Sequence, residues 1–74
     1  MTLIVANTYR AANAVARTHG LHRDQWRLAR EWHDVIGRQP DQVLYAYDAN
    51  QVSQRVFDEI ALLDAKGMIG RSGT

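Results

Sequence analysis

The sequence predicts an α/β fold built on a small parallel sheet. Two apolar runs, residues 3–6 and 43–47, each stop at polar residues and are each followed by a helical pattern. A strand, a polar turn and a helix in repeated succession are typical of parallel sheets. We therefore expect three strands alternating with three short helices, with the strands in the spatial order 2-1-3. Residues 1–67 should form this single domain, and residues 68–74 a flexible tail.

The first strand and helix have clear boundaries. A strand is expected over residues 2–6, which are all apolar after the first and therefore suit a central strand covered on both faces. Asn7 or Thr8 should cap the helix over residues 9–19, because a short side-chain oxygen can accept from the free amides of the first turn. Gly20 should end this helix.

Residues 21–37 are open to two interpretations. As one helix, the segment would place Leu28, Trp32 and Ile36 on a single stripe. Alternatively, residues 25–29 form a strand and residues 31–36 a short helix. We favour the second interpretation, because three parallel strands then share the core and every connection stays short.

The last unit starts after a turn at Pro40, which cannot continue a helix. A strand is expected over residues 42–47, and Asn50 or Ser53 should start the final helix, which Gly67 ends. The apolar positions of that helix share one face: Val52, Val56, Ile60 and Leu63.

Composition limits the possible functions. Nine basic and eight acidic side chains leave a formal net charge of +1, which is too balanced for a general binder of nucleic acids or anionic membranes. The absence of cysteine excludes disulfides and thiolate metal sites. No long apolar span or leader is evident, so a cytoplasmic location without membrane association is expected. The charge is uneven, because six arginines fall between Arg10 and Arg38.

Several residues together resemble a group of short α/β proteins encoded by actinobacterial phages. They occur in this order: Leu3-Ile4-Val5, Thr8-Tyr9-Arg10, His19-Gly20-Leu21, Asp24-x-Trp26-Arg27, His33-Asp34 and Val43-Leu44. The resemblance implies a small Rossmann-like half-domain in which residues 25–29 are a strand. It implies no activity, and it would place the protein in the cytoplasm of a bacterial host.

The turn after the first strand is one candidate site. In a parallel sheet, Asn7, Thr8 and Arg10 would lie near the carboxyl edge with Asp48 and Asn50, where a helix amino terminus and a guanidinium can bind an anion. The alternative is that the short polar residues are helix caps and turn formers. We favour this alternative, because the turn lacks the glycines of a phosphate-binding loop.

A second candidate site surrounds Trp32, which is flanked in sequence by Arg27, Arg30 and His33. Tryptophan and arginine are common at binding hot spots, and such residues can also stack on single-stranded nucleic acid. The alternative is that Trp32 closes the open end of the core, while Trp26 on the second strand is buried within it.

The remaining chemistry is sparse. The three histidines, His19, His22 and His33, do not have the spacing of metal ligands, so neither a metal nor another cofactor is expected. No catalytic motif is present.

Three short helices cannot cover both faces and both edges of a sheet, so some apolar surface should remain. The sequence therefore predicts a non-enzymatic module that binds a protein partner or itself as a homo-oligomer. The alternatives are a weak nucleic-acid binder that uses the arginine-rich first half, and an anion or nucleotide site at the turn formed by Asn7, Thr8 and Arg10.

Overall fold

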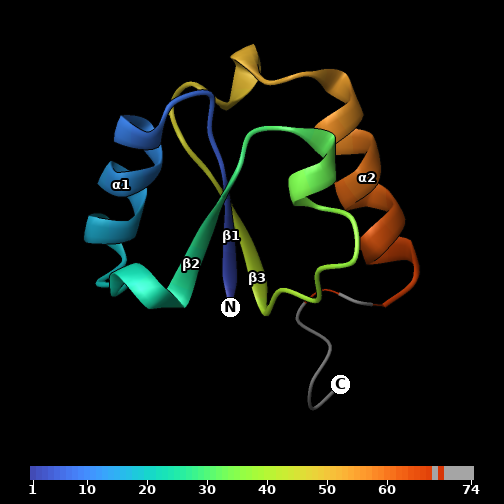
Figure 1. Ribbon diagram of the computed structural model, residues 1–74, viewed down its shortest axis with the longest axis horizontal. Coiled ribbons are helices and arrows are strands. Elements are labelled where there is room, and N and C mark those ends of the chain that lie inside the picture. The colour runs from blue at the N-terminus through green and yellow to red at the C-terminus, as the bar shows by residue number, and fades with distance from the viewer. Residues whose placement is uncertain (68, 70–74) are drawn as a thin grey trace.

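The computed structural model describes residues 1–67 and residue 69, and it has three layers, with a sheet between two helices (Figure 1). The strands are β1 (Thr2–Val5), β2 (Trp26–Ala29) and β3 (Gln42–Tyr45), and all pairings are parallel in the order β2-β1-β3. The helices are α1 (Tyr9–Thr18) and α2 (Gln54–Ala65). The predicted α/β class, parallel sheet, central first strand and 2-1-3 order are confirmed.

The strand register sorts the side chains onto two faces. Ile4 lies level with Leu28 and Leu44, and these three side chains face α1. Their neighbours Leu3 and Val5 face α2, because side chains alternate along a strand. The central strand is therefore apolar on both faces, and all four of its residues are buried.

The expected helix over residues 31–36 is wrong. In its place there is a single 3-10 turn, Trp32–Asp34, so residues 1–67 form two α-helices and not three. Two local features explain the difference. The Asp34 carboxylate accepts from the backbone N–H of Glu31 at 2.9 Å, which closes a tight turn, and Gly37 with φ of +77° then redirects the chain.

The two helices begin and end with residues that suit those positions. The Thr8 hydroxyl accepts from the N–H of Ala11 at 3.2 Å, and the Ser53 hydroxyl accepts from the N–H of Arg55 at 3.3 Å. After α1 the chain turns at Gly20, whose φ of +67° is a conformation that only glycine adopts without strain. Both ends of every strand lie within two residues of the predicted positions.

Two apolar clusters lie on opposite faces of the sheet. The α1-side cluster contains Ile4, Ala6, Ala11, Ala12, Ala16, Trp26 and Ala46. The α2-side cluster contains Leu3, Val5, Ala29, Val35, Ala49, Val52, Val56, Ile60 and Leu63. Trp26 is only 1% exposed, as expected for the tryptophan on the second strand. One indole therefore fills the space that the small alanines of α1 leave.

The predicted tail, residues 68–74, lies outside the described residues except for Ile69. That residue is half-buried and packs against the α2-side cluster. Among the described residues, no helix has the length and hydropathy needed to cross a membrane.

Candidate functional site

The carboxyl ends of the strands meet at the upper edge of the sheet in Figure 1, where the segments after β1 and β3 lie side by side. Asp48, which follows β3, connects them. One of its carboxylate oxygens accepts from the backbone N–H of Asn7 at 3.0 Å, and the other accepts from the Thr8 hydroxyl at 2.9 Å. The Asn7 side chain also donates to the Gln51 side-chain oxygen at 3.3 Å.

These contacts bring two of the three predicted anion-binding residues together, but they use them internally. Thr8 caps α1, and Asn7 and Thr8 both bond to the carboxylate of Asp48. Arg10 is exposed on α1, and among the described residues no hydrogen bond joins it to Asn7, Thr8 or Asp48. An anion bound here would meet a buried negative charge, which is unfavourable at so short a distance. The geometry is that of helix capping and turn formation.

The segment around Trp32 forms a compact surface feature. Trp32 is half-buried against the α2-side cluster, and the Arg55 guanidinium carbon lies 3.9 Å from the centre of its indole ring. The ring of His33 meets the indole edge-on at 5.8 Å. Trp32 therefore closes one end of the core, and one ring face is already covered by a cation.

The other predicted partners of Trp32 take up separate roles. Arg27 donates from Nη1 to the Trp26 carbonyl oxygen at 3.0 Å, and the backbone N–H of Arg30 bonds to the Asp34 carboxylate at 3.3 Å. His33 lies 3.9 Å from that carboxylate and is largely exposed. The sequence did not indicate Arg55, which comes from the first turn of α2 and reaches Trp32 only through the fold.

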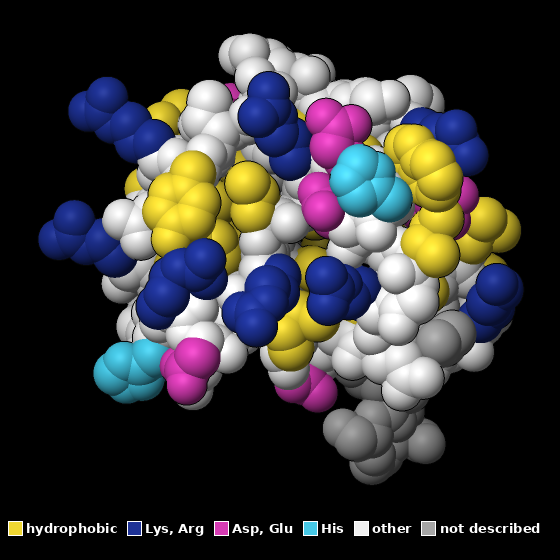
Figure 2. Space-filling model, viewed as in Figure 1, with side chains coloured by type: hydrophobic (Ala, Val, Ile, Leu, Met, Phe, Trp, Pro, Cys, Tyr) yellow, Lys and Arg dark blue, Asp and Glu magenta, His cyan; other side chains and the backbone are white. Residues whose placement is uncertain are grey.

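A third aromatic group lies on the opposite side of the sheet. The Arg23 guanidinium carbon lies 5.4 Å from the ring centre of Tyr9 and 5.0 Å from that of Trp26. Dark blue basic side chains gather across the face shown in Figure 2, with hydrophobic side chains between them. Trp26 is buried, so its ring is not available to stack on a nucleic-acid base, and Arg23 lies over the half-exposed ring of Tyr9.

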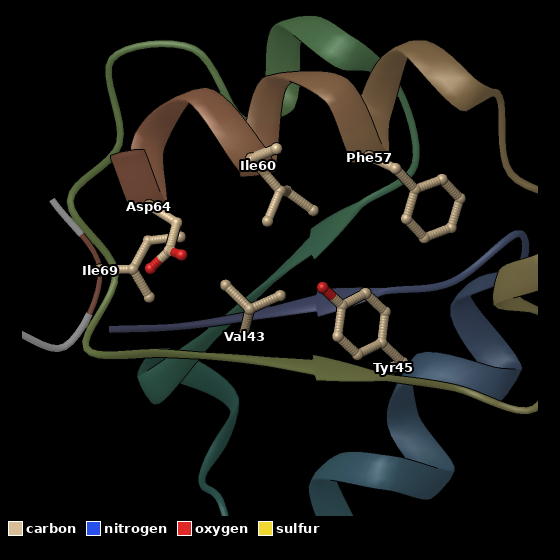
Figure 3. A pocket seen from close by; sticks show the side chains of 7 residues that line it. Val43, Tyr45, Phe57, Ile60, Asp64 and Ile69 are labelled. Atoms are coloured by element: carbon tan, nitrogen blue, oxygen red, sulfur yellow. The ribbon is translucent and has the colours of Figure 1, made fainter. Parts of the chain in front are cut away.

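An open hollow lies between β3 and α2 (Figure 3). This β3–α2 groove has a volume of about 390 Å³ and is lined by Val43, Tyr45, Phe57, Ile60, Ala61, Asp64 and Ile69. The rings of Tyr45 and Phe57 stack at 6.1 Å with their planes 14° apart. Tyr45 is 54% exposed, and Tyr47, just beyond the strand, is more exposed still.

Sequence reasoning missed this groove. It expected some apolar surface to remain and placed the strand over residues 42–47 at an edge of the sheet, but it did not note that alternation puts Val43, Tyr45 and Tyr47 on one face. The signal available was the pair of tyrosines at alternate positions, because an aromatic ring with a polar tip suits a half-exposed surface. The partner ring of Phe57 could not be assigned without the packing of α2.

No group of three or more His, Asp or Glu side chains in the described part of the chain is placed to hold a metal ion. Comparisons with protein-family models, curated proteins and solved structures found no match to the chain. The resemblance to phage proteins therefore stays a prediction.

Proposed function

We propose that the protein is a non-enzymatic interaction module that binds its partner through the β3–α2 groove. The observation that carries the proposal is the groove itself, an apolar hollow with the half-exposed Tyr45 stacked on Phe57 at its rim. Exposed aromatic side chains around an apolar hollow are typical of protein-binding surfaces. The partner is either a further copy of the chain or a protein of a bacterial host cytoplasm, if the phage resemblance holds.

The polar side chains near Asp48, Arg23 and Arg55 make contacts within the fold. Asp48 bonds to Asn7 and Thr8 within the fold, and Arg23 and Arg55 cover aromatic rings. These groups stabilise the small domain. The β3–α2 groove is different, because its apolar side chains gain burial only when another surface covers them.

A photocrosslinker tests the proposal directly. We expect p-benzoylphenylalanine in place of Tyr45 to give a discrete crosslinked product in cells that produce the protein. The matched control is the same replacement of Tyr9, which is 47% exposed but lies on the α1 side of the sheet. Products are measured by gel electrophoresis and mass spectrometry.

The pattern of products decides the outcome. A product from position 45 and none from position 9 supports the groove as the binding surface. Equal labelling from both positions, or none from position 45 with any protein, the chain itself included, would show that the groove is not a binding surface.

A further inference from the structure

We infer that the occupant of this surface is a second copy of the chain, added edge to edge so that the two β3 strands pair antiparallel and the two sheets become one. This inference rests on the proposed function and names its partner. Three observations support it. Only the β3 edge of the sheet is free of charged side chains, the β3 sequence can pair favourably with a second copy of itself, and the groove has an apolar aromatic end and an acidic end.

The β2 edge is blocked by its own side chains. The Arg27 side chain donates to the outward-facing carbonyl of Trp26 at 3.0 Å, and the Asp34 carboxylate accepts from the N–H of Arg30 at 3.3 Å. Arg27 is also exposed on the strand itself. Charged side chains on an edge strand are a known way to prevent pairing with another chain.

The β3 edge has no such protection. The N–H of Ala46 donates to the Val5 carbonyl at 2.9 Å, so by alternation the backbone of Leu44 also faces β1 and that of Val43 and Tyr45 faces outward. Among the described residues, no side chain bonds to these outward backbone groups. The stretch from Gln42 to Tyr47 contains no charged residue.

The sequence of β3 matches itself in one antiparallel register. With a two-fold axis through Leu44 and perpendicular to the sheet, Val43 of each copy lies opposite Tyr45 of the other. These are the residues with outward backbone groups, so each pair exchanges both of its N–H···O bonds. A β-branched side chain opposite an aromatic one is also a favourable cross-strand pair.

The same operation on β2 is unfavourable. An axis through the middle of that strand would place Arg27 opposite Arg27 of the second copy, and like charges directly opposite each other are destabilising. In the β3 register, Asp41 faces the uncharged Tyr47. The unprotected β3 edge can therefore pair with β3 of a second copy without placing like charges opposite each other.

The groove is consistent with this arrangement. Figure 3 shows Tyr45 and Phe57 at one end and Asp64 with Ile69 at the other. A two-fold axis reverses the second groove, so the Asp64 end of one copy lies beside the aromatic end of the other. The two Asp64 carboxylates are then far apart, and the apolar walls from Phe57 of both copies lie along a shared channel.

The test measures the solution mass by sedimentation equilibrium over a wide concentration range. We expect a monomer–dimer equilibrium for the unchanged chain and for Leu62→Lys, a control on the outer side of α2 that is 51% exposed. Tyr45→Lys should weaken the dimer by roughly tenfold or more, because it removes two symmetric cross-strand pairs and adds like charges near the axis.

Amide hydrogen exchange on the unchanged chain gives a second measurement that needs no variant. Protection at Val43 and Tyr45 should rise with protein concentration, while Leu28, whose N–H faces outward on the β2 edge, should exchange at a constant rate. A chain that stays monomeric, a dimer unaffected by Tyr45→Lys, or concentration-dependent protection at Leu28 would overturn the β3 pairing. If the chain is monomeric yet position 45 crosslinks to another protein, only this inference fails and the proposed function stands.

Discussion

Asp48 is a buried carboxylate that connects two segments far apart in the sequence. Only 6% of its surface is exposed, and its two oxygens accept from Asn7 and Thr8, 41 and 40 residues away. A buried carboxylate is costly unless such donors are present. The pair of bonds therefore fixes both the entry to α1 and the exit from β3.

Replacement of this carboxylate should measurably destabilise the fold. We expect Asp48→Ala to lower the free energy of unfolding by about 1–3 kcal/mol, because the Asn7 N–H and the Thr8 hydroxyl lose their partner. Asp48→Asn should lose less, since one acceptor oxygen remains. Urea unfolding followed by circular dichroism measures both. The control is Asp58→Asn on the exposed surface of α2, for which we expect a change below about 0.5 kcal/mol.

At the residue scale, the sequence indicated what a residue does locally but not which distant residue it contacts. It marked Asn7 and Thr8 as capping residues, and Thr8 is the cap of α1. It did not pair them with Asp48, and it gave no reason to join Arg55 to Trp32. Both contacts link segments more than 20 residues apart, so they depend on the strand order and on the path of the chain after β3.

The two edge strands are the elements in which sequence differences have the clearest consequence. β2 and β3 each have four residues and each pair with β1, yet only β2 carries an arginine that bonds to its own outer edge. An exposed strand edge is a template for pairing with other chains. If chains associate through their sheet edges, the charge at position 27 should restrict that association to β3.

Removal of that charge should open the second edge. We expect Arg27→Val to change the free energy of unfolding by less than about 0.5 kcal/mol, since the side chain is exposed, but to form species larger than a dimer. Light scattering at increasing concentration measures this. Arg17→Val, an exposed position on α1, is the control and should leave the mass distribution unchanged. If Arg27→Val and Arg17→Val gave the same mass distribution, Arg27 would not be what prevents pairing at the β2 edge.

At the element scale, the strands and the two α-helices were predictable because each has a local pattern of apolar residues and caps. The error was the helix expected over residues 31–36. Its apolar spacing suits a helix, but only a few residues separate Ala29 from Gly37, and the Asp34 carboxylate closes a 3-10 turn there. The tertiary structure therefore overrides the helical preference of this segment.

The whole molecule is small for a parallel sheet. With 74 residues, it buries only about 60% of the surface that its unfolded chain exposes. One helix covers each face, and the β3–α2 groove stays open. Its fold class and strand order could be predicted from the sequence. The position of the open groove could not, because it depends on how far α2 reaches across the sheet.

If pairing through β3 stabilises the native state, heat stability should depend on protein concentration. We expect the midpoint temperature of the unchanged chain to rise as the concentration rises, because mass action favours the folded dimer over unfolded monomers. Differential scanning calorimetry measures the midpoint. Tyr45→Lys should show a midpoint independent of concentration over the range in which it is monomeric. A concentration-independent midpoint for both proteins would argue against coupling between folding and association.

The central position of β1 also determines when the sheet can form during synthesis. Thr2 pairs with Trp26 and with Gln42, so both neighbours of the first strand are made long after it. Both strand pairings in the described part of the chain join residues distant in sequence, so no hairpin there can nucleate the sheet locally. While the ribosome makes residues 6–25, the apolar first strand has no strand to join. Folding is therefore expected to wait until about residue 45 has left the exit tunnel, and a pause in translation before that point would prolong the exposure of β1 to chaperones and proteases.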